Sequence, residues 1–241
     1  MRPHSILSKI LDVIVPRQCE LCGCRLAGEE EMLCLSCLYD LPLTHHFADL
    51  YENEMAQRFW HFIPVERAAA LMVYRGQAMH SQLIYQLKYG GRKDIGLYLG
   101  RLLGREAQNA GFFDNADALI PIPITKGRQR ERGYNQSLCI ARGLHEVSRL
   151  PILTDAVERI LFNGSQTEKH HWERIKNVEG AFSVTADYLP GAIKNQLLQG
   201  KHIIIVDDVC TTGATVIACA QALQKAGVKA FSVLTLGCTD S

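Results

Sequence analysis

Two adjacent carboxylates and a short run of small and hydroxylated residues form the stretch of this sequence best equipped for chemistry. Asp207 and Asp208 close an apolar run that begins at Ile203, and a turn over residues 211–215 follows closely. Small side chains allow backbone N–H groups to converge on a bound anion at the start of a helix. We therefore expect a phosphate cradle made by Thr211, Thr212, Gly213, Ala214 and Thr215.

The two adjacent aspartates, Asp207 and Asp208 (the acid pair), restrict the class of ligand that this stretch could bind. Neighbouring negative charges repel each other unless hydroxyl groups or a cation lie nearby, and a sugar phosphate bound with Mg²⁺ brings both. Its 5'-phosphate would bind in the turn and its ribose hydroxyls on Asp207 and Asp208. The alternative is a strand that ends in a solvated acidic turn, which is common for one aspartate but accounts poorly for the whole arrangement. No Gly-Lys-Ser/Thr follows the glycine, which disfavours nucleoside triphosphate hydrolysis.

Two basic segments supply the positive charge that a sugar pyrophosphate needs. Residues 125–133 are expected to be a loop without regular structure, in which Thr125, Lys126 and Arg128 would contact pyrophosphate. Residues 166–177 are expected to be a mobile flap that closes the site and carries Arg174. The alternatives are a solvated surface loop for the first segment and a short surface helix for the second.

Paired cysteines near the N-terminus indicate a metal site. Two Cys-x2-Cys pairs lie eleven residues apart, a spacing that lets four thiolates surround one Zn²⁺: Cys19, Cys22, Cys34 and Cys37. Cys24 competes as a ligand, and His45 or His46 is a further alternative to one of the cysteines. Closed coordination by four ligands is typical of structural zinc. Nine cysteines without a secretory signal favour free thiols and a cytoplasmic location.

Hydrophobic periodicity places these residues on an α/β fold. Strands are expected at residues 68–74, 118–123, 181–184, 203–206 and 230–236, and helices at 52–62, 79–89, 94–111, 135–149 and 215–227. This alternation predicts a mostly parallel, twisted sheet flanked by helices, with ligand at the carboxyl ends of the strands. We divide the chain into residues 1–66, with an amphipathic helix, the zinc knuckle and a linker, and residues 67–241.

Composition and charge restrict the possible functions of the chain but do not indicate a specific one. The chain has 241 residues and a net charge of +1, so it has no overall attraction to nucleic acid or to membranes. The apolar run over residues 6–15 is too short to span a bilayer. We expect a packing helix there, with a membrane-surface anchor as the alternative.

The acidic stretch resembles the phosphoribosyl pyrophosphate signature of type I phosphoribosyltransferases, in which apolar residues precede Asp-Asp-x-x-Thr-Thr-Gly-x-Thr. Together with the cysteine pairs, the chain resembles the competence protein F (ComF) family nearly end to end. The further motifs that carry this resemblance are residues 85–92, 121–123, 130–136 and 174–177, with Gln166. The resemblance implies a zinc element on a phosphoribosyltransferase domain and, for some members, the handling of incoming single-stranded DNA. Cys210 at the variable position of the signature is expected to pack as a small apolar residue, with a redox role as the alternative.

Three functions follow from these patterns. The first is a protein that binds phosphoribosyl pyrophosphate with Mg²⁺ and transfers phosphoribose to an unknown nitrogen acceptor, with Asp207, Asp208 and Arg174 as catalytic residues. The second is a non-catalytic adaptor that binds single-stranded DNA or a DNA-uptake helicase through Arg128, Arg130 and Arg132. The third is a regulator in which the sugar pyrophosphate orders the flap.

Overall fold

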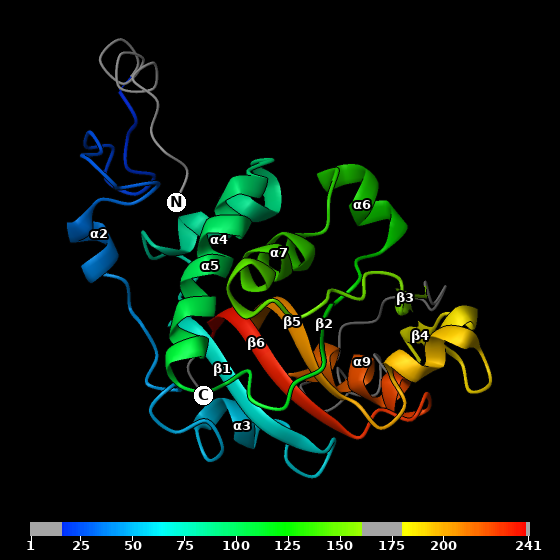
Figure 1. The fold of residues 1–241 in the computed structure, drawn as a ribbon. Coiled ribbons are helices and arrows are strands. Elements are labelled where there is room, and N and C mark those ends of the chain that lie inside the picture. The colour runs from blue at the N-terminus through cyan, green and yellow to red at the C-terminus, as the bar shows by residue number, and fades with distance from the viewer. Residues whose placement is uncertain (1–15, 161–179, 240–241) are drawn as a thin grey trace.

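A parallel sheet of four strands forms the centre of the computed structural model, which describes residues 16–160 and 180–239 (Figure 1). The strands lie in the order β1-β6-β5-β2, and all neighbours pair in parallel. Their bounds are Val65–Val73 for β1, Ala118–Pro121 for β2, His202–Cys210 for β5 and Ala230–Cys238 for β6. β6 is buried along its whole length, as an apolar strand covered on both faces should be. The expected fold class is confirmed.

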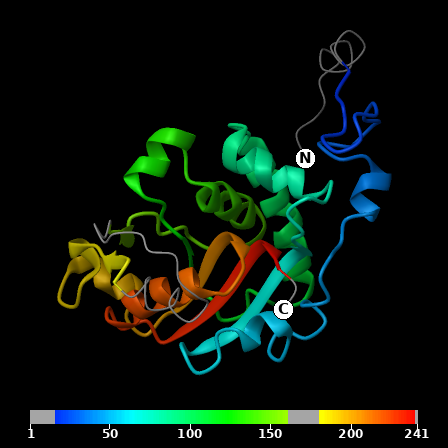
Figure 2. The ribbon, with the colours of Figure 1, turned by 180° about the vertical axis from the view of Figure 1, so that it is seen from behind.

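Helices cover both faces of this sheet. One face packs against α4 (Ser81–Tyr89), α5 (Lys93–Asn109) and α7 (Gln136–Ser148). The other packs against α3 (Glu54–Gln57) and α9 (Ala214–Gln224), which Figure 2 shows from behind. Alternate residues of β5 divide between the two cores, since Ile203 and Ile205 face α9 while Ile204 and Val206 face α5 and α7.

The close approach of α5 and α7 depends on glycine. A Cβ atom on Gly100 would collide with the carbonyl oxygen of Ile140, and one on Gly143 would collide with the carbonyl oxygen of Leu97. The backbones of α5 and α7 are therefore in direct contact, which fixes the position of α7 over β5. This packing places the first turn of α7 beside the carboxyl end of β5.

The cysteine-containing element, residues 16–50, includes the short helix α2 (Leu35–Tyr39) and lies beside α4 and α5 (Figure 1). Arg92, just before α5, forms a bidentate ion pair with Glu20, with nitrogen to oxygen distances of 2.9 and 2.8 Å. Arg101 of α5 forms a second ion pair, with Glu31. Apolar residues of this element belong to the same buried cluster as α5 and α7. The division of the chain at residue 66 stays a prediction.

Several smaller elements lie outside the main sheet. β3 (Val157–Arg159) and β4 (Phe182–Val184) pair antiparallel outside the main sheet. The 3-10 helices η1 (Ala186–Tyr188) and η2 (Ile193–Leu197) follow β4. Helix α6 (Lys126–Arg132) lies between β2 and α7.

Several expectations are confirmed and others are wrong. β6 and the helices near residues 79–89, 94–111 and 135–149 are found within a few residues of their expected bounds, and β5 begins where expected. The expected loop at 125–133 is instead a helix, because Thr125 caps it with an oxygen 3.2 Å from the Arg128 nitrogen and Gly133 ends it in the left-handed region. The linker helix spans only Glu54–Gln57, and β5 runs past both aspartates to Cys210. The expected helix at 6–15 and flap at 166–177 lie outside the described residues. None of the helices within 16–160 and 180–239 is long and apolar enough to cross a membrane.

Candidate functional site

Three elements meet at the carboxyl end of β5, where the two aspartates lie. The Asp207 carboxylate oxygen Oδ1 accepts hydrogen bonds from the Ser137 hydroxyl at 3.0 Å and from the Asp208 backbone N–H at 2.9 Å. The Asp208 carboxylate instead faces α4, where its Oδ1 lies 3.1 Å from Lys88 Nζ. The acid pair is therefore held by α7 on one side and α4 on the other, and its two members have different partners.

The two aspartates also differ in electrostatic environment. Burial, followed by the neighbouring charge of Asp208, raises the pKa of Asp207 to about 7. The bonds from Ser137 and from the Asp208 N–H oppose this rise only in part. A ligand whose hydroxyl groups donate hydrogen bonds to this buried carboxylate would offset the cost of burying its charge.

The turn after β5 has the form of an anion cradle. Gly213 adopts a φ of +79° at the N-terminus of α9, a conformation that glycine adopts at no steric cost. A Cβ atom there would lie 2.8 Å from Cε1 of the Phe59 ring. Within the described residues, the N–H groups of Thr212 and Gly213 donate no hydrogen bond. Unpaired donors at the start of an eleven-residue helix are suited to a phosphate.

Arg58 holds this turn from the side of α3. Its guanidinium donates hydrogen bonds to the carbonyl oxygens of Cys210 at 3.4 Å, of Thr211, and of Thr239 at 2.5 Å. Carbonyls held by a cation on one side leave the N–H groups of the turn free for a ligand. The sequence pattern gave no reason to choose Arg58, because it lies far along the chain from the turn. Cys210 is buried, as expected for a packing residue.

The basic residues assigned to pyrophosphate belong to α6, not to a loop. Thr125 caps this helix, while Lys126 and Arg128 are exposed on it. A further cation comes from β3, since burial and then the positive charge of Arg128 lower the pKa of Arg159, against the opposing charge of Asp207. The charges of Arg159 and Asp207 therefore act on each other, and sequence reasoning did not assign Arg159 to the site. Arg174 lies outside the described residues.

Gln136 is the first residue of α7, and it directly precedes Ser137, whose hydroxyl donates to Asp207. The Gln136 side chain is 1% exposed, and neither its amide nitrogen nor its amide oxygen has a hydrogen-bond partner among the described residues. Buried amides are normally paired, so the Gln136 amide lacks the partners that a buried amide requires among the described residues.

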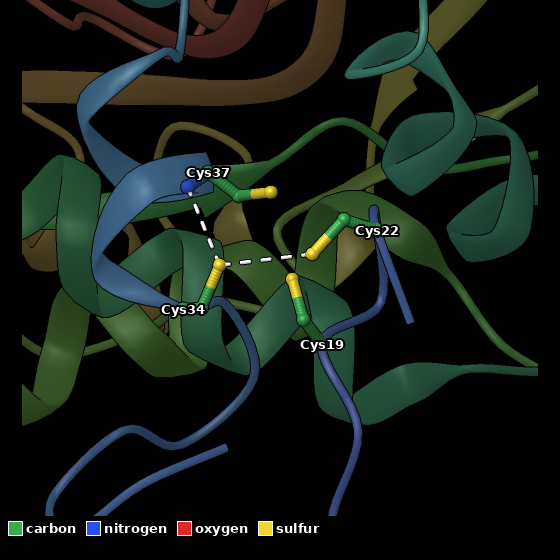
Figure 3. A group of neighbouring side chains, drawn as sticks. All are labelled: Cys19, Cys22, Cys34 and Cys37. Atoms are coloured by element: carbon green, nitrogen blue, oxygen red, sulfur yellow. Dashed lines mark hydrogen bonds between the residues drawn. The ribbon is translucent and has the colours of Figure 1, made fainter. Parts of the chain in front are cut away.

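Figure 3 shows the four expected cysteines pointing toward one another. Their sulfur atoms all lie within 4.8 Å of one another, and Cys22 Sγ is 3.7 Å from Cys34 Sγ. Tetrahedral Zn²⁺ with bonds of about 2.3 Å requires sulfur atoms about 3.8 Å apart, so the residues fit this metal. The Cys37 N–H donates to Cys34 Sγ at 3.5 Å, which orients that ligand. Hydrogen bonds with the backbone and thiol of Cys24 lower the pKa of Cys22 to about 6.

The competing ligands are placed outside this cluster. Cys24 does not belong to the set of mutually close sulfur atoms, although it lies beside Cys22. His46 is buried, and its Nδ1 accepts a hydrogen bond from the Ala70 N–H at 3.2 Å. His46 therefore supports β1 and does not ligate the metal.

Comparison with known proteins gives a consistent set of relatives. Residues 139–237 match the family model described as phosphoribosyl transferase domain. The DNA utilization protein YhgH of Escherichia coli K12 is 30% identical over 221 residues, which cover 90% of this chain and 88% of that protein. Competence protein F of Haemophilus influenzae is 30% identical over 156 residues, covering 64% of this chain and 65% of that protein. Competence protein ComFC of Bacillus subtilis is 36% identical over 120 residues, covering 50% and 43%.

Solved structures show more distant likeness. Glutamine phosphoribosylpyrophosphate amidotransferase from B. subtilis has a TM-score of 0.38 at 19% identity, covering 61% of this chain and 26% of that one. A hypoxanthine phosphoribosyltransferase from Staphylococcus aureus has a TM-score of 0.33 at 17% identity, covering 58% and 62%. Likeness at this level carries no argument about ligands.

Proposed function

Because the chain belongs to the family of competence protein F and DNA utilization protein YhgH and contains a phosphoribosyltransferase domain, we propose that it binds phosphoribosyl pyrophosphate with Mg²⁺. The observation that carries this proposal is the position of the acid pair beside a turn in which the N–H groups of Thr212 and Gly213 have no hydrogen-bond partner among the described residues. The ribose hydroxyls would bind Asp207 and Asp208. The 5'-phosphate would bind the N–H groups of the turn at residues 211–215.

The pyrophosphate end of the ligand would face α6 and β3. Lys126 and Arg128 are exposed on α6, and Thr125 caps the start of this helix. The charge of Arg159 interacts with the charges of Arg128 and Asp207. Arg174 is assigned to the same end on the sequence alone. A bound Mg²⁺ supplies charge neutralisation of the pyrophosphate oxygens.

The reaction that such a site supports is displacement at the anomeric carbon. The bond from that carbon to the pyrophosphate oxygen breaks, and its electron pair leaves with pyrophosphate. The lone pair of a nitrogen acceptor forms the new carbon–nitrogen bond, and the proton of that nitrogen passes to water. The protein's part is to hold the ribose through the acid pair and to surround the leaving group with cations such as Arg128 and Arg159.

We assign structural Zn²⁺ to the four-cysteine cluster. The Glu20–Arg92 ion pair joins this element to the turn between α4 and α5. Since Glu20 directly follows the ligand Cys19, metal binding would stabilise the docking of the element on the domain.

Calorimetric titration of phosphoribosyl pyrophosphate with Mg²⁺ tests the proposal. The wild type should bind, and the doubly substituted Asp207→Asn, Asp208→Asn variant should bind at least about tenfold more weakly, because charged hydrogen bonds to the ribose are lost. Asp155→Asn is the matched control, because Asp155 forms an ion pair with Lys194 and has no contact with the acid pair among the interactions of the described residues. Equal affinities for the wild type and the double variant would refute the proposal, as would no binding by either.

A second function, adaptor binding of single-stranded DNA, is favoured by α6. This helix buries none of its residues and exposes Arg128 and Arg130, and the relatives' names refer to competence and DNA utilization. Phosphate contacts would make the binding of an oligothymidylate fall with salt. If Arg128→Ala, Arg130→Ala leaves oligothymidylate retention unchanged at low salt, this second function does not reside on α6.

A further inference from the structure

Lys88 of α4 forms the only ion pair that Asp208 has among the described residues. Its Nζ lies 3.1 Å from Asp208 Oδ1, and the two side chains are 21% and 14% exposed. Water and salt screen such a sheltered pair less than a pair on the open surface, so its two charges interact more strongly. The carboxylate that is assigned to a ribose hydroxyl is thus neutralised by the chain itself.

The last turn of α4 fixes the position of Lys88. Leu87 is fully buried, and its carbonyl oxygen accepts a hydrogen bond from the hydroxyl of Tyr134, two residues before α7. The Gly90 N–H donates to the Gln86 carbonyl oxygen at 2.8 Å and closes the helix. A lysine in the last turn is also favoured by the helix dipole. The backbone that carries the ammonium group is therefore held beside the acid pair by packing.

A divalent cation would compete with Lys88 for the same oxygen atom. Two neighbouring carboxylates are the hard oxygen donors that Mg²⁺ and Mn²⁺ prefer, so the acid pair fits such an ion. An Mg²⁺ ion bound to Asp208 Oδ1 at about 2.1 Å would lie no more than about 5 Å from Lys88 Nζ. A positive charge at that distance in a partly buried site repels the ion. The charge of Lys88 also acts on Asp207, so it opposes a cation on either carboxylate.

We infer that Lys88 is the counter-ion of the acid pair in the free protein, and that it prevents a lone divalent cation from binding there. The metal ion then enters only together with the sugar pyrophosphate, whose negative charge compensates for the charge of Lys88. This inference rests on the proposed function, because that ligand must share Asp208 with Lys88 or displace it. Lys88 is a positioning residue that acts through Asp208, and it takes no part in bond breaking.

Binding of Mn²⁺ alone tests this role, because electron paramagnetic resonance measures the free fraction of this ion. The zinc-loaded full chain is titrated at pH 8 without phosphoribosyl pyrophosphate, and urea unfolding checks that each variant is folded. The wild type is compared with Lys88→Met, Lys88→Gln, Lys88→Arg, Lys93→Met, and Lys88→Met combined with Asp208→Asn. Lys93→Met is the matched control, because Lys93 carries the same charge at the start of α5 and its Nζ lies 5.3 Å from the centroid of the Tyr134 ring.

We expect Lys88→Met and Lys88→Gln to bind one Mn²⁺ at least about tenfold more tightly than the wild type, because a like charge close to the ion is removed. Lys88→Arg should bind the ion as weakly as the wild type, since it keeps the charge. Lys93→Met should also match the wild type, which separates the effect from a general loss of positive charge. The added Asp208→Asn substitution should abolish the gain, because the ion loses a carboxylate ligand.

Equal Mn²⁺ affinity in the wild type and in both neutral variants of Lys88 overturns the inference. A gain that survives Asp208→Asn, or that Lys88→Arg or Lys93→Met reproduces, overturns it as well. Calorimetry of phosphoribosyl pyrophosphate with Mg²⁺ on the wild type separates this result from the proposed function. If Lys88→Met gains Mn²⁺ while the wild type fails to bind phosphoribosyl pyrophosphate, the proposed function falls and the counter-ion role stands. If the wild type binds that ligand but neither neutral variant gains Mn²⁺, the counter-ion role falls and the proposed function stands.

Discussion

Replacement of Asp207 by asparagine should stabilise the protein while it weakens ligand binding. Asparagine has the shape of the carboxylate and keeps an oxygen to accept from Ser137 and from the backbone N–H of Asp208. It removes the charge that burial and Asp208 disfavour. The wild-type residue is therefore expected to be held at a cost in stability, as is common in binding sites.

The size and pH dependence of this effect follow from the pKa. A rise from the ordinary value of 3.8 to about 7 means that the folded protein binds a proton more tightly than the unfolded chain does. Between these values the folded state carries more bound protons, so the free energy of unfolding falls as pH rises. Above pH 7 the loss is roughly 4 kcal/mol, and below about pH 4 it vanishes because both states are protonated.

Urea denaturation at pH 5 and at pH 8 measures this difference. Asp207→Asn should raise the free energy of unfolding by several kcal/mol at pH 8, and by clearly less at pH 5. Asp155→Asn is a control of opposite sign, because hydrogen bonds from Lys194 and Tyr188 lower the pKa of Asp155. A variant at position 207 that is no more stable than the wild type at pH 8, or whose gain is the same at both pH values, would refute the reasoning.

Three further outcomes are expected. Zinc released on denaturation should amount to about one equivalent for the wild type and for Cys24→Ser, and to much less for Cys34→Ser; equal loss in both variants would contradict the assignment of ligands. Arg58→Gln should weaken phosphoribosyl pyrophosphate binding by roughly tenfold, because the turn loses its charged hydrogen bonds, and unchanged affinity by calorimetry would argue against this support. Gly213→Ala should lower the free energy of unfolding by about 2 kcal/mol, and Phe59→Leu should partly restore it; additive losses would show that no clash occurs.

Helices and strands can be predicted from the sequence pattern where one face of the element, or the whole element, is buried. β6 lies almost where its apolar run predicts, and α7 begins after Asn135, whose side chain accepts from the Ser137 N–H. Helix α6 could not be found from periodicity, because it has no apolar face and buries no residue. Its cap at Thr125 and its stop at Gly133 were the available indications.

The site was predictable only where its residues are contiguous in the sequence. Asp207, Asp208 and the following turn lie together on one strand and one loop, and so do the two cysteine pairs within their own element. Lys88, Ser137 and Arg58 come from separate elements, and they reach the acid pair and its turn because of the strand order and the packing of α4, α7 and α3. Pattern alone does not give that order.

A crystal structure of the complex with phosphoribosyl pyrophosphate and Mg²⁺ tests the central claim most directly. We expect the 5'-phosphate on the backbone N–H groups of Thr212 and Gly213, and the ribose hydroxyls within hydrogen-bonding distance of Asp207 and Asp208. A ligand bound elsewhere, or an empty turn with both carboxylates directed away from it, would contradict the account.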